Sequence, residues 1–65
     1  MYQVELVWNR EFHFVPFGKA KETIEEAKKY AVGLLDMGDG ARVKKCQVID
    51  YNTGEIVVKS YEIRI

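Results

Sequence analysis

The sequence predicts an α+β domain in which a four-stranded, mainly antiparallel sheet carries one helix packed on one face, in the order ββαββ. Three observations predict it. Residues 2–8 place apolar side chains at every second position, as a half-buried strand does. Residues 24–35 place apolar side chains three and four positions apart, which is the spacing of one helix face. Residues 42–50 and 55–63 are rich in Val, Ile and Tyr and flank a turn sequence, which is typical of a β-hairpin.

The first strand is expected to form a hairpin with residues 11–16. A three-residue loop after Trp8 places that residue opposite Phe12, and it places Leu6 opposite Phe14. In this register the even-numbered aromatic side chains share one face of the sheet. We therefore expect the two Phe rings to face the same side as Trp8.

The segment "WNREFHFV" also holds the only histidine of the chain, His13. In the predicted register His13 points to the face opposite the two Phe rings, so the segment indicates a strand and not a histidine site between aromatics. Pro16 has no N–H for the hydrogen-bond ladder, and we therefore expect this strand at an edge of the sheet.

The helix has the clearest local signals. Thr23 and Glu26 have the spacing of a capping box, which predicts a helix beginning near Ile24. The glycine-rich residues 38–40 are expected to end it. Gly33, inside the helix, costs about 1 kcal/mol relative to Ala, which indicates either close backbone packing or simple tolerance. The expected buried stripe is Ile24, Ala27, Ala31, Leu34 and Leu35.

The last two strands are joined by the sequence "DYNTGE". Gly54 accepts a positive φ, and the Asp50 carboxylate accepts hydrogen bonds from the N–H groups of the loop. The alternation of apolar residues shifts within residues 43–46 and again within residues 56–58. These shifts predict β-bulges or strands buried on both faces.

A chain of 65 residues has room for one domain, which we assign to residues 1–65. Domains below roughly 70–80 residues usually need disulfides, a metal or a partner chain for stability. One cysteine, Cys46, and one histidine provide neither a disulfide nor a zinc site. We therefore expect no metal, no cofactor, and a homodimer that forms through a strand edge or the uncovered face of the sheet.

The charges of the chain cancel, because ten basic side chains face ten acidic ones. No net field draws it toward nucleic acid, a membrane or an acidic partner. No apolar segment approaches the roughly 18–20 residues of a membrane-spanning helix, and residues 1–8 lack the basic and apolar regions of a signal peptide. We expect a cytoplasmic protein without membrane contact.

The chain holds eight aromatic side chains, more than one helix can cover, and Tyr and Trp suit interfaces. We predict a small non-enzymatic protein-interaction module, and an inhibitor or modulator of a larger protein is one such form. In size and layout it resembles the compact accessory proteins of phages and mobile elements, a similarity of general shape only. The acidic residues at the helix start also complement the helix dipole. The predicted contact residues are Trp8, Glu22, Glu25, Glu26, Tyr30, Tyr51 and Tyr61.

Two alternatives belong to other classes. Arg42, Lys44 and Lys45 at a strand start, with aromatics on the sheet, are the residue types that bind nucleic acid. The neutral net charge opposes that alternative, and basic residues at strand ends also prevent edge pairing. A nucleophilic Cys46 with His13 as its base is the third hypothesis, although a lone strand cysteine usually behaves as a small buried hydrophobe.

Overall fold

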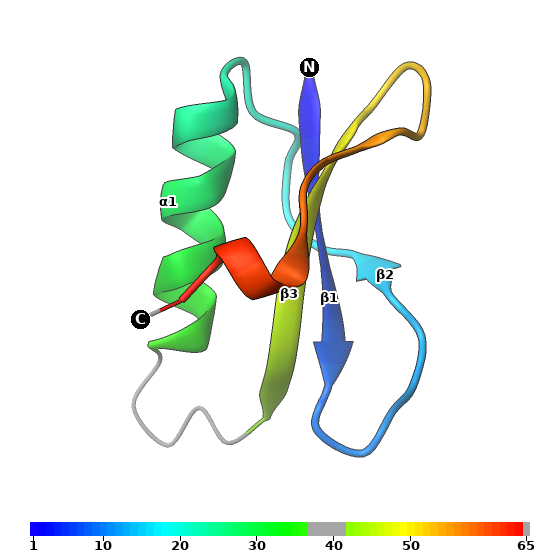
Figure 1. Cartoon of the computed structure of the whole chain (residues 1–65), viewed down its shortest axis with the longest axis vertical. Coiled ribbons are helices and arrows are strands. Elements are labelled where there is room, and N and C mark those ends of the chain that lie inside the picture. The colour runs from blue at the N-terminus through cyan, green and yellow to red at the C-terminus, as the bar shows by residue number, and fades with distance from the viewer. Residues whose placement is uncertain (37–41, 65) are drawn as a thin grey trace.

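The computed structural model describes residues 1–36 and 42–64, and it shows the predicted α+β architecture. Neighbouring strands are all antiparallel, and their order in the sheet is β2-β1-β3-β4. Helix α1 lies along one face of the sheet (Figure 1). The elements are β1 (Tyr2–Trp8), β2 (Val15–Pro16), α1 (Ile24–Leu35), β3 (Val43–Asp50), β4 (Ile56–Val58) and the 3-10 helix η1 (Ser60–Glu62).

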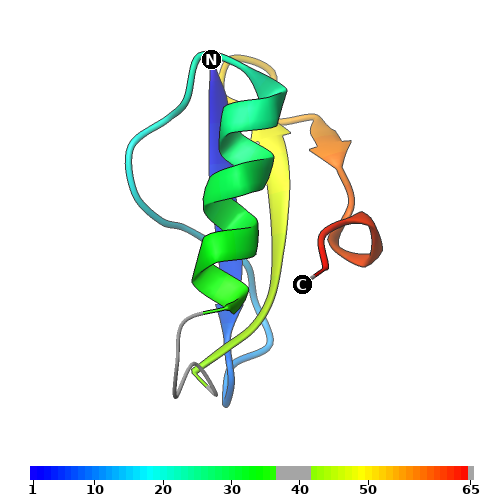
Figure 2. The same cartoon turned by 90° about the vertical axis from the view of Figure 1, so that its left-hand side faces the viewer.

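The core lies between α1 and the two central strands. Strands β1 and β3 pair from Tyr2 and Asp50 at one end to Trp8 and Val43 at the other. Figure 2 shows α1 in front of these strands and running along them. Alternate side chains of the strands point toward the helix, as a half-buried sheet requires. The core side chains, none more than 7% exposed, are Val4, Leu6, Ala27, Ala31, Leu34, Cys46, Val48, Val58 and Ile63.

Helix α1 begins where the capping signal predicts. The Thr23 hydroxyl oxygen accepts a hydrogen bond from the Glu26 backbone N–H (3.1 Å). The Thr23 hydroxyl also lies within donating distance of the Glu26 carboxylate (3.3 Å), so this carboxylate contacts the hydroxyl and not the backbone N–H of the predicted box. Half of the capping box is therefore confirmed, and the start of the helix with it.

The predicted apolar stripe of α1 is confirmed at its centre. Ala27, Ala31 and Leu34 are buried, whereas Ile24 is 38% exposed at the first turn. The predicted stop at residues 38–40 lies outside the described residues. Within the described part of the chain, no helix is both long enough and apolar enough to cross a membrane.

The first hairpin differs from the prediction. Strand β2 consists of Val15 and Pro16 only, and Val15 lies opposite Leu6. The predicted pairing of Leu6 with Phe14 is therefore wrong by one residue. The predicted strand over residues 11–16 is also wrong, because only its last two residues form β2. A shift of one residue moves every side chain to the other face of a sheet.

The shifted register has a physical reason. It places Phe17 against the core, where its N–H donates to the Val4 carbonyl oxygen (3.0 Å). Phe12 and Phe14 are left to pack on two lysines at the start of β3. The observed register thus packs Phe17 partly against the core and leaves Phe12 exposed beside Lys44.

Both predicted bulges are confirmed. Strand β1 pairs Val7 with Lys45 and Trp8 with Val43, which leaves Lys44 as the extra residue. Strand β3 pairs Val48 with Val58 and Ile49 with Ile56, which leaves Val57 as the extra residue of β4.

The turn before β4 is confirmed, but the predicted length of the last strand, residues 55–63, is wrong. The Asp50 carboxylate accepts from the N–H groups of Asn52 (2.8 Å) and Thr53 (3.2 Å). Strand β4 ends at Val58, because the Lys59 N–H donates to the Glu62 carboxylate and closes the turn of η1. This turn directs Ile63, 4% exposed, into the core.

The face of the sheet opposite α1 is polar at its centre. The Gln47 side-chain amide donates to the Glu5 carboxylate (2.8 Å), and the Gln3 amide donates to the Phe17 carbonyl oxygen (3.1 Å). Val7 also points to this face and is nevertheless 1% exposed. This face is thus not the broad apolar surface that a sheet-to-sheet dimer uses.

Candidate functional site

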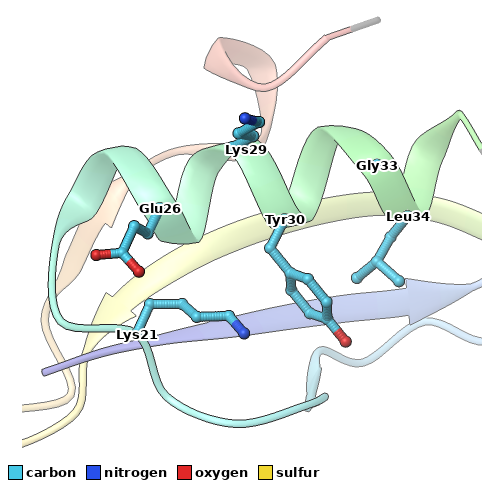
Figure 3. Close-up of a pocket in the computed structure, with 6 residues that line it drawn as sticks. All are labelled: Lys21, Glu26, Lys29, Tyr30, Gly33 and Leu34. Carbon is cyan, nitrogen blue, oxygen red and sulfur yellow. The ribbon is translucent and has the colours of Figure 1, made fainter.

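Tyr30 lines a hollow between α1 and the connection from β2 to α1 (Figure 3). The Lys21 ammonium lies 4.3 Å from the centre of the Tyr30 ring, a cation–π contact. A Cβ at Gly18 would lie 2.5 Å from the Tyr30 hydroxyl oxygen, so only glycine allows this close approach. The lining residues of this Tyr30 hollow are Lys21, Glu26, Lys29, Tyr30, Gly33 and Leu34.

A second hollow lies at Trp8, which is 36% exposed, and it is also lined by Glu11, His13 and Val15. The Trp8 ring meets the Phe17 ring edge to face, with centres 5.6 Å apart. Phe17 is followed by Gly18, which lies against Tyr30, so a series of contacts leads from Trp8 through Phe17 and Gly18 to Tyr30 on α1. We call this surface the α1 flank, and it comprises Trp8, Val15, Phe17, Lys21, Glu26 and Tyr30.

The α1 flank contains three of the seven predicted contact residues: Trp8, Glu26 and Tyr30. Glu22 and Glu25 are exposed nearby at the start of α1. Glu25 lines an adjacent hollow on α1, which shares Glu26 and Lys29 with the Tyr30 hollow.

The remaining two predicted contact residues lie apart from the α1 flank. Tyr51, 61% exposed, is at the tip of the β3–β4 hairpin, where its N–H bonds to the Met1 carbonyl oxygen. Met1 precedes β1 and Trp8 ends it, so Tyr51 and Trp8 are at opposite ends of the sheet. Tyr61, 64% exposed, belongs to η1.

The residues of the nucleic-acid alternative gather at the start of β3. The Lys44 ammonium lies 5.0 Å from the centre of the Phe12 ring and donates to the Glu11 carbonyl oxygen (3.1 Å). The Lys45 ammonium lies 5.5 Å from the centre of the Phe14 ring. Arg42 is exposed directly before β3.

Phe12 belongs to the aromatic residues that the nucleic-acid alternative counted for base stacking, and its exposure is what the sequence did not predict. Its side chain is 84% exposed, the highest value among the large apolar residues of the described chain. The predicted register placed Phe12 directly across from Trp8, on the same face of the sheet. The polar residues around Phe12 were a signal of its exposure. A strand that extended through "NREFH" into the sheet would bury charged side chains.

Cys46 and His13 are in different environments. Cys46 is fully buried under α1, and its thiol donates to the Ala31 carbonyl oxygen (3.8 Å). Burial raises the pKa of the Cys46 thiol to about 11. Because the thiolate is the nucleophile, such a thiol is poorly suited to attack, and His13 lies exposed at the Trp8 hollow. Among the described residues, no group of three or more potential ligands is arranged to hold a metal.

Comparison with protein family models, with curated proteins and with solved structures gives no match.

Proposed function

We propose that the chain is a small non-enzymatic protein-interaction module that contacts its partner through the α1 flank. The observation that carries this proposal is the series of contacts from Trp8 through Phe17 and Gly18 to Tyr30, with a hollow at Trp8 and another at Tyr30. Tyr and Trp dominate the energetics of protein interfaces because they combine a large apolar area with a polar tip.

The charges around the Tyr30 hollow suit an interface. Lys21, Glu26 and Lys29 line its edge, while Leu34 lies at its base and is buried. Interfaces combine such an apolar centre with a polar rim. At the other end of the α1 flank, Val15, 39% exposed, extends the apolar area beside Trp8.

The aromatic side chains of the α1 flank are already held in place. Tyr30 is fixed between Lys21 and Gly18, and Trp8 rests on Phe17. Side chains that are ordered before binding lose little conformational entropy on binding, which favours affinity.

One form of such a module is an inhibitor or modulator, which would act by occupying part of the surface of a larger protein. The accessory proteins of phages and mobile elements are of similar general shape. We place the protein in the cytoplasm, where a single free cysteine stays reduced, and assign it no cofactor.

The test uses a substitution that fills the Tyr30 hollow without harming the fold. A Cβ at Gly33 meets no atom within 4 Å, and Gln is a better helix former than Gly, so Gly33→Gln should fold at least as well as the wild type. The immobilised wild-type chain captures its partner from an extract of the source cells, and calorimetry with the purified partner then gives the Kd. We expect Gly33→Gln to weaken binding by about 30-fold or more.

The matched control is Lys28→Gln, which introduces the same side chain on the same helix but outside the Tyr30 hollow. It should leave the Kd unchanged. Equal binding by wild type and Gly33→Gln would show that the α1 flank is not the interface.

A further inference from the structure

We infer that the side of the molecule formed by Phe12, Phe14 and the basic residues around them binds single-stranded nucleic acid. This surface shares no residue with the α1 flank, so the inference can be tested independently of the protein-interaction proposal. We call it the Phe12 surface, and it comprises Arg10, Phe12, Phe14, Arg42, Lys44 and Lys45.

The fold brings together basic side chains that are far apart in the sequence. Residues 8–15 and 42–46 meet at this end of the sheet, because Trp8 pairs with Val43 and Lys44 donates to the Glu11 carbonyl oxygen. The basic side chains of these two segments are Arg10, Arg42, Lys44 and Lys45, against the single acid Glu11. Four positive charges and one negative charge give the two segments a net charge of +3, although the whole chain is neutral. The surface therefore complements a polyanion.

The exposed Phe12 ring makes a nucleic acid a better ligand than other polyanions. Its side chain is 84% exposed, with the Lys44 ammonium 5.0 Å from the ring centre. An unpaired base stacks on such a ring, and its phosphate then lies close to a lysine. Phe14 and Lys45 repeat the arrangement two residues further along the segment, with 5.5 Å between the ammonium and the ring centre.

A single strand suits the Phe12 surface better than a duplex does. The faces of bases in a duplex are covered by their neighbours, so an aromatic side chain reaches them only when the bases are unstacked. Stacking on an aromatic ring also accepts every base, because each base has a π face. We therefore expect little sequence preference and a strong dependence on salt.

The test measures fluorescence anisotropy of a labelled oligothymidylate of about 12 nucleotides, a length within the range of single-strand sites. Phe12→Ala removes an exposed ring and should keep the fold, which circular dichroism checks. We expect Phe12→Ala to bind at least about tenfold more weakly than the wild type. Replacing Lys44 and Lys45 together by Gln should weaken binding and lower the slope of log K against log salt by about 1.4, from about 0.7 for each phosphate contact.

The chain offers a matched control in Lys28 and Lys29, a second adjacent lysine pair, exposed on α1. Replacing both by Gln changes the net charge equally and should alter neither affinity nor slope. Gly33→Gln, which fills the Tyr30 hollow, should also bind the oligonucleotide normally.

Three results would overturn the inference. The first is a wild-type chain that does not bind the oligonucleotide at about 50 mM salt. The second is equal binding of inorganic polyphosphate, with Phe12→Ala as active as the wild type, because attraction would then be due to charge alone. The third is tighter binding of polyglutamate than of the oligonucleotide, which would assign the Phe12 surface to an acidic protein.

Discussion

Cys46 is the residue whose chemistry depends most on its position in the fold. Its thiol is fully buried beneath α1, with the Ala31 carbonyl oxygen as its acceptor. Desolvation raises its pKa from 9.0 to about 11, because a thiolate in the core would lack the water that stabilises its charge. The same burial that makes Cys46 a good core residue makes it a poor nucleophile.

The raised pKa of Cys46 predicts a loss of stability in alkali. Above pH 9 the unfolded chain releases the thiol proton, whereas the folded chain keeps it up to about pH 11. The unfolded state then binds fewer protons, so the free energy of unfolding falls as the pH rises from about 9 to about 11. Denaturant titrations of wild type and Cys46→Ala at about pH 8 and about pH 10.5 test this, since tyrosines and lysines affect both forms alike. An equal loss of stability in the two forms would contradict the prediction.

Among the elements, the contact between α1 and the connection before it determines the shape of the candidate site. Gly18 has a φ of +75°, and the Tyr30 ring occupies the space where a side chain would stand. Gly33, on α1 itself, has open space around it. The two glycines therefore have opposite roles, and of the two explanations for Gly33, tolerance is the correct one.

This difference predicts opposite effects of the same substitution. Gly18→Ala should lower the free energy of unfolding by more than about 1 kcal/mol, because it combines an unfavourable φ with a collision at Tyr30. Gly33→Ala should raise it by up to about 1 kcal/mol through helix propensity. Thermal melts followed by circular dichroism should shift by roughly 4–8 °C per kcal/mol, in opposite directions. A Gly18→Ala melt that matches the wild type would mean that Tyr30 is not held as described.

The helix cap and the turn after β3 were predictable from the sequence, whereas the register of the β1–β2 hairpin was not. The cap at Thr23 and the turn at Asp50 depend on hydrogen bonds within three residues, so their sequence signals were sufficient. The register of β2 goes with contacts to other segments, because Phe17 packs against the core while Phe12 and Phe14 meet lysines at the start of β3. A register that goes with such distant contacts cannot be derived from alternation along one segment.

At the scale of the whole molecule, the homodimer predicted from chain length remains a proposal, and the free edge at β4 supports one arrangement. Ile56 on this edge strand is 48% exposed, whereas β2 at the other edge has two residues and a proline. The face opposite α1 is occupied by hydrogen-bonded amides and is a weaker candidate. Pairing of two β4 edges would extend the sheet across both copies.

Light scattering should then give twice the chain mass at both low and high salt, because the contact is made by backbone hydrogen bonds and apolar side chains. Ile56→Lys should give a monomer. Tyr51→Lys, which adds the same charge at the exposed hairpin tip, should remain a dimer. A wild-type chain that is a monomer at every concentration would rule out the dimer and leave the α1 flank proposal intact.

The candidate site could be predicted only in part. The residue types were informative, since Trp8, Glu26 and Tyr30 of the predicted set lie on the α1 flank. Their companions were not foreseen, because Phe17 joins the flank only in the observed register of β2. The exposure of Phe12 was not foreseen either. In an alternating pattern, an aromatic residue is expected on the buried face of a strand.

The order of residues along the chain is enough to derive the fold class, the helix Ile24–Leu35 and the turn after β3, because these follow from short periods in the chain and contacts between near neighbours. Three features became known from the folded structure: the register of β2, the end of β4 at Val58, and the contact of Phe12 with Lys44. Those outcomes depend on which side chains compete for the same core and the same sheet face, and that competition exists only once distant segments are packed together.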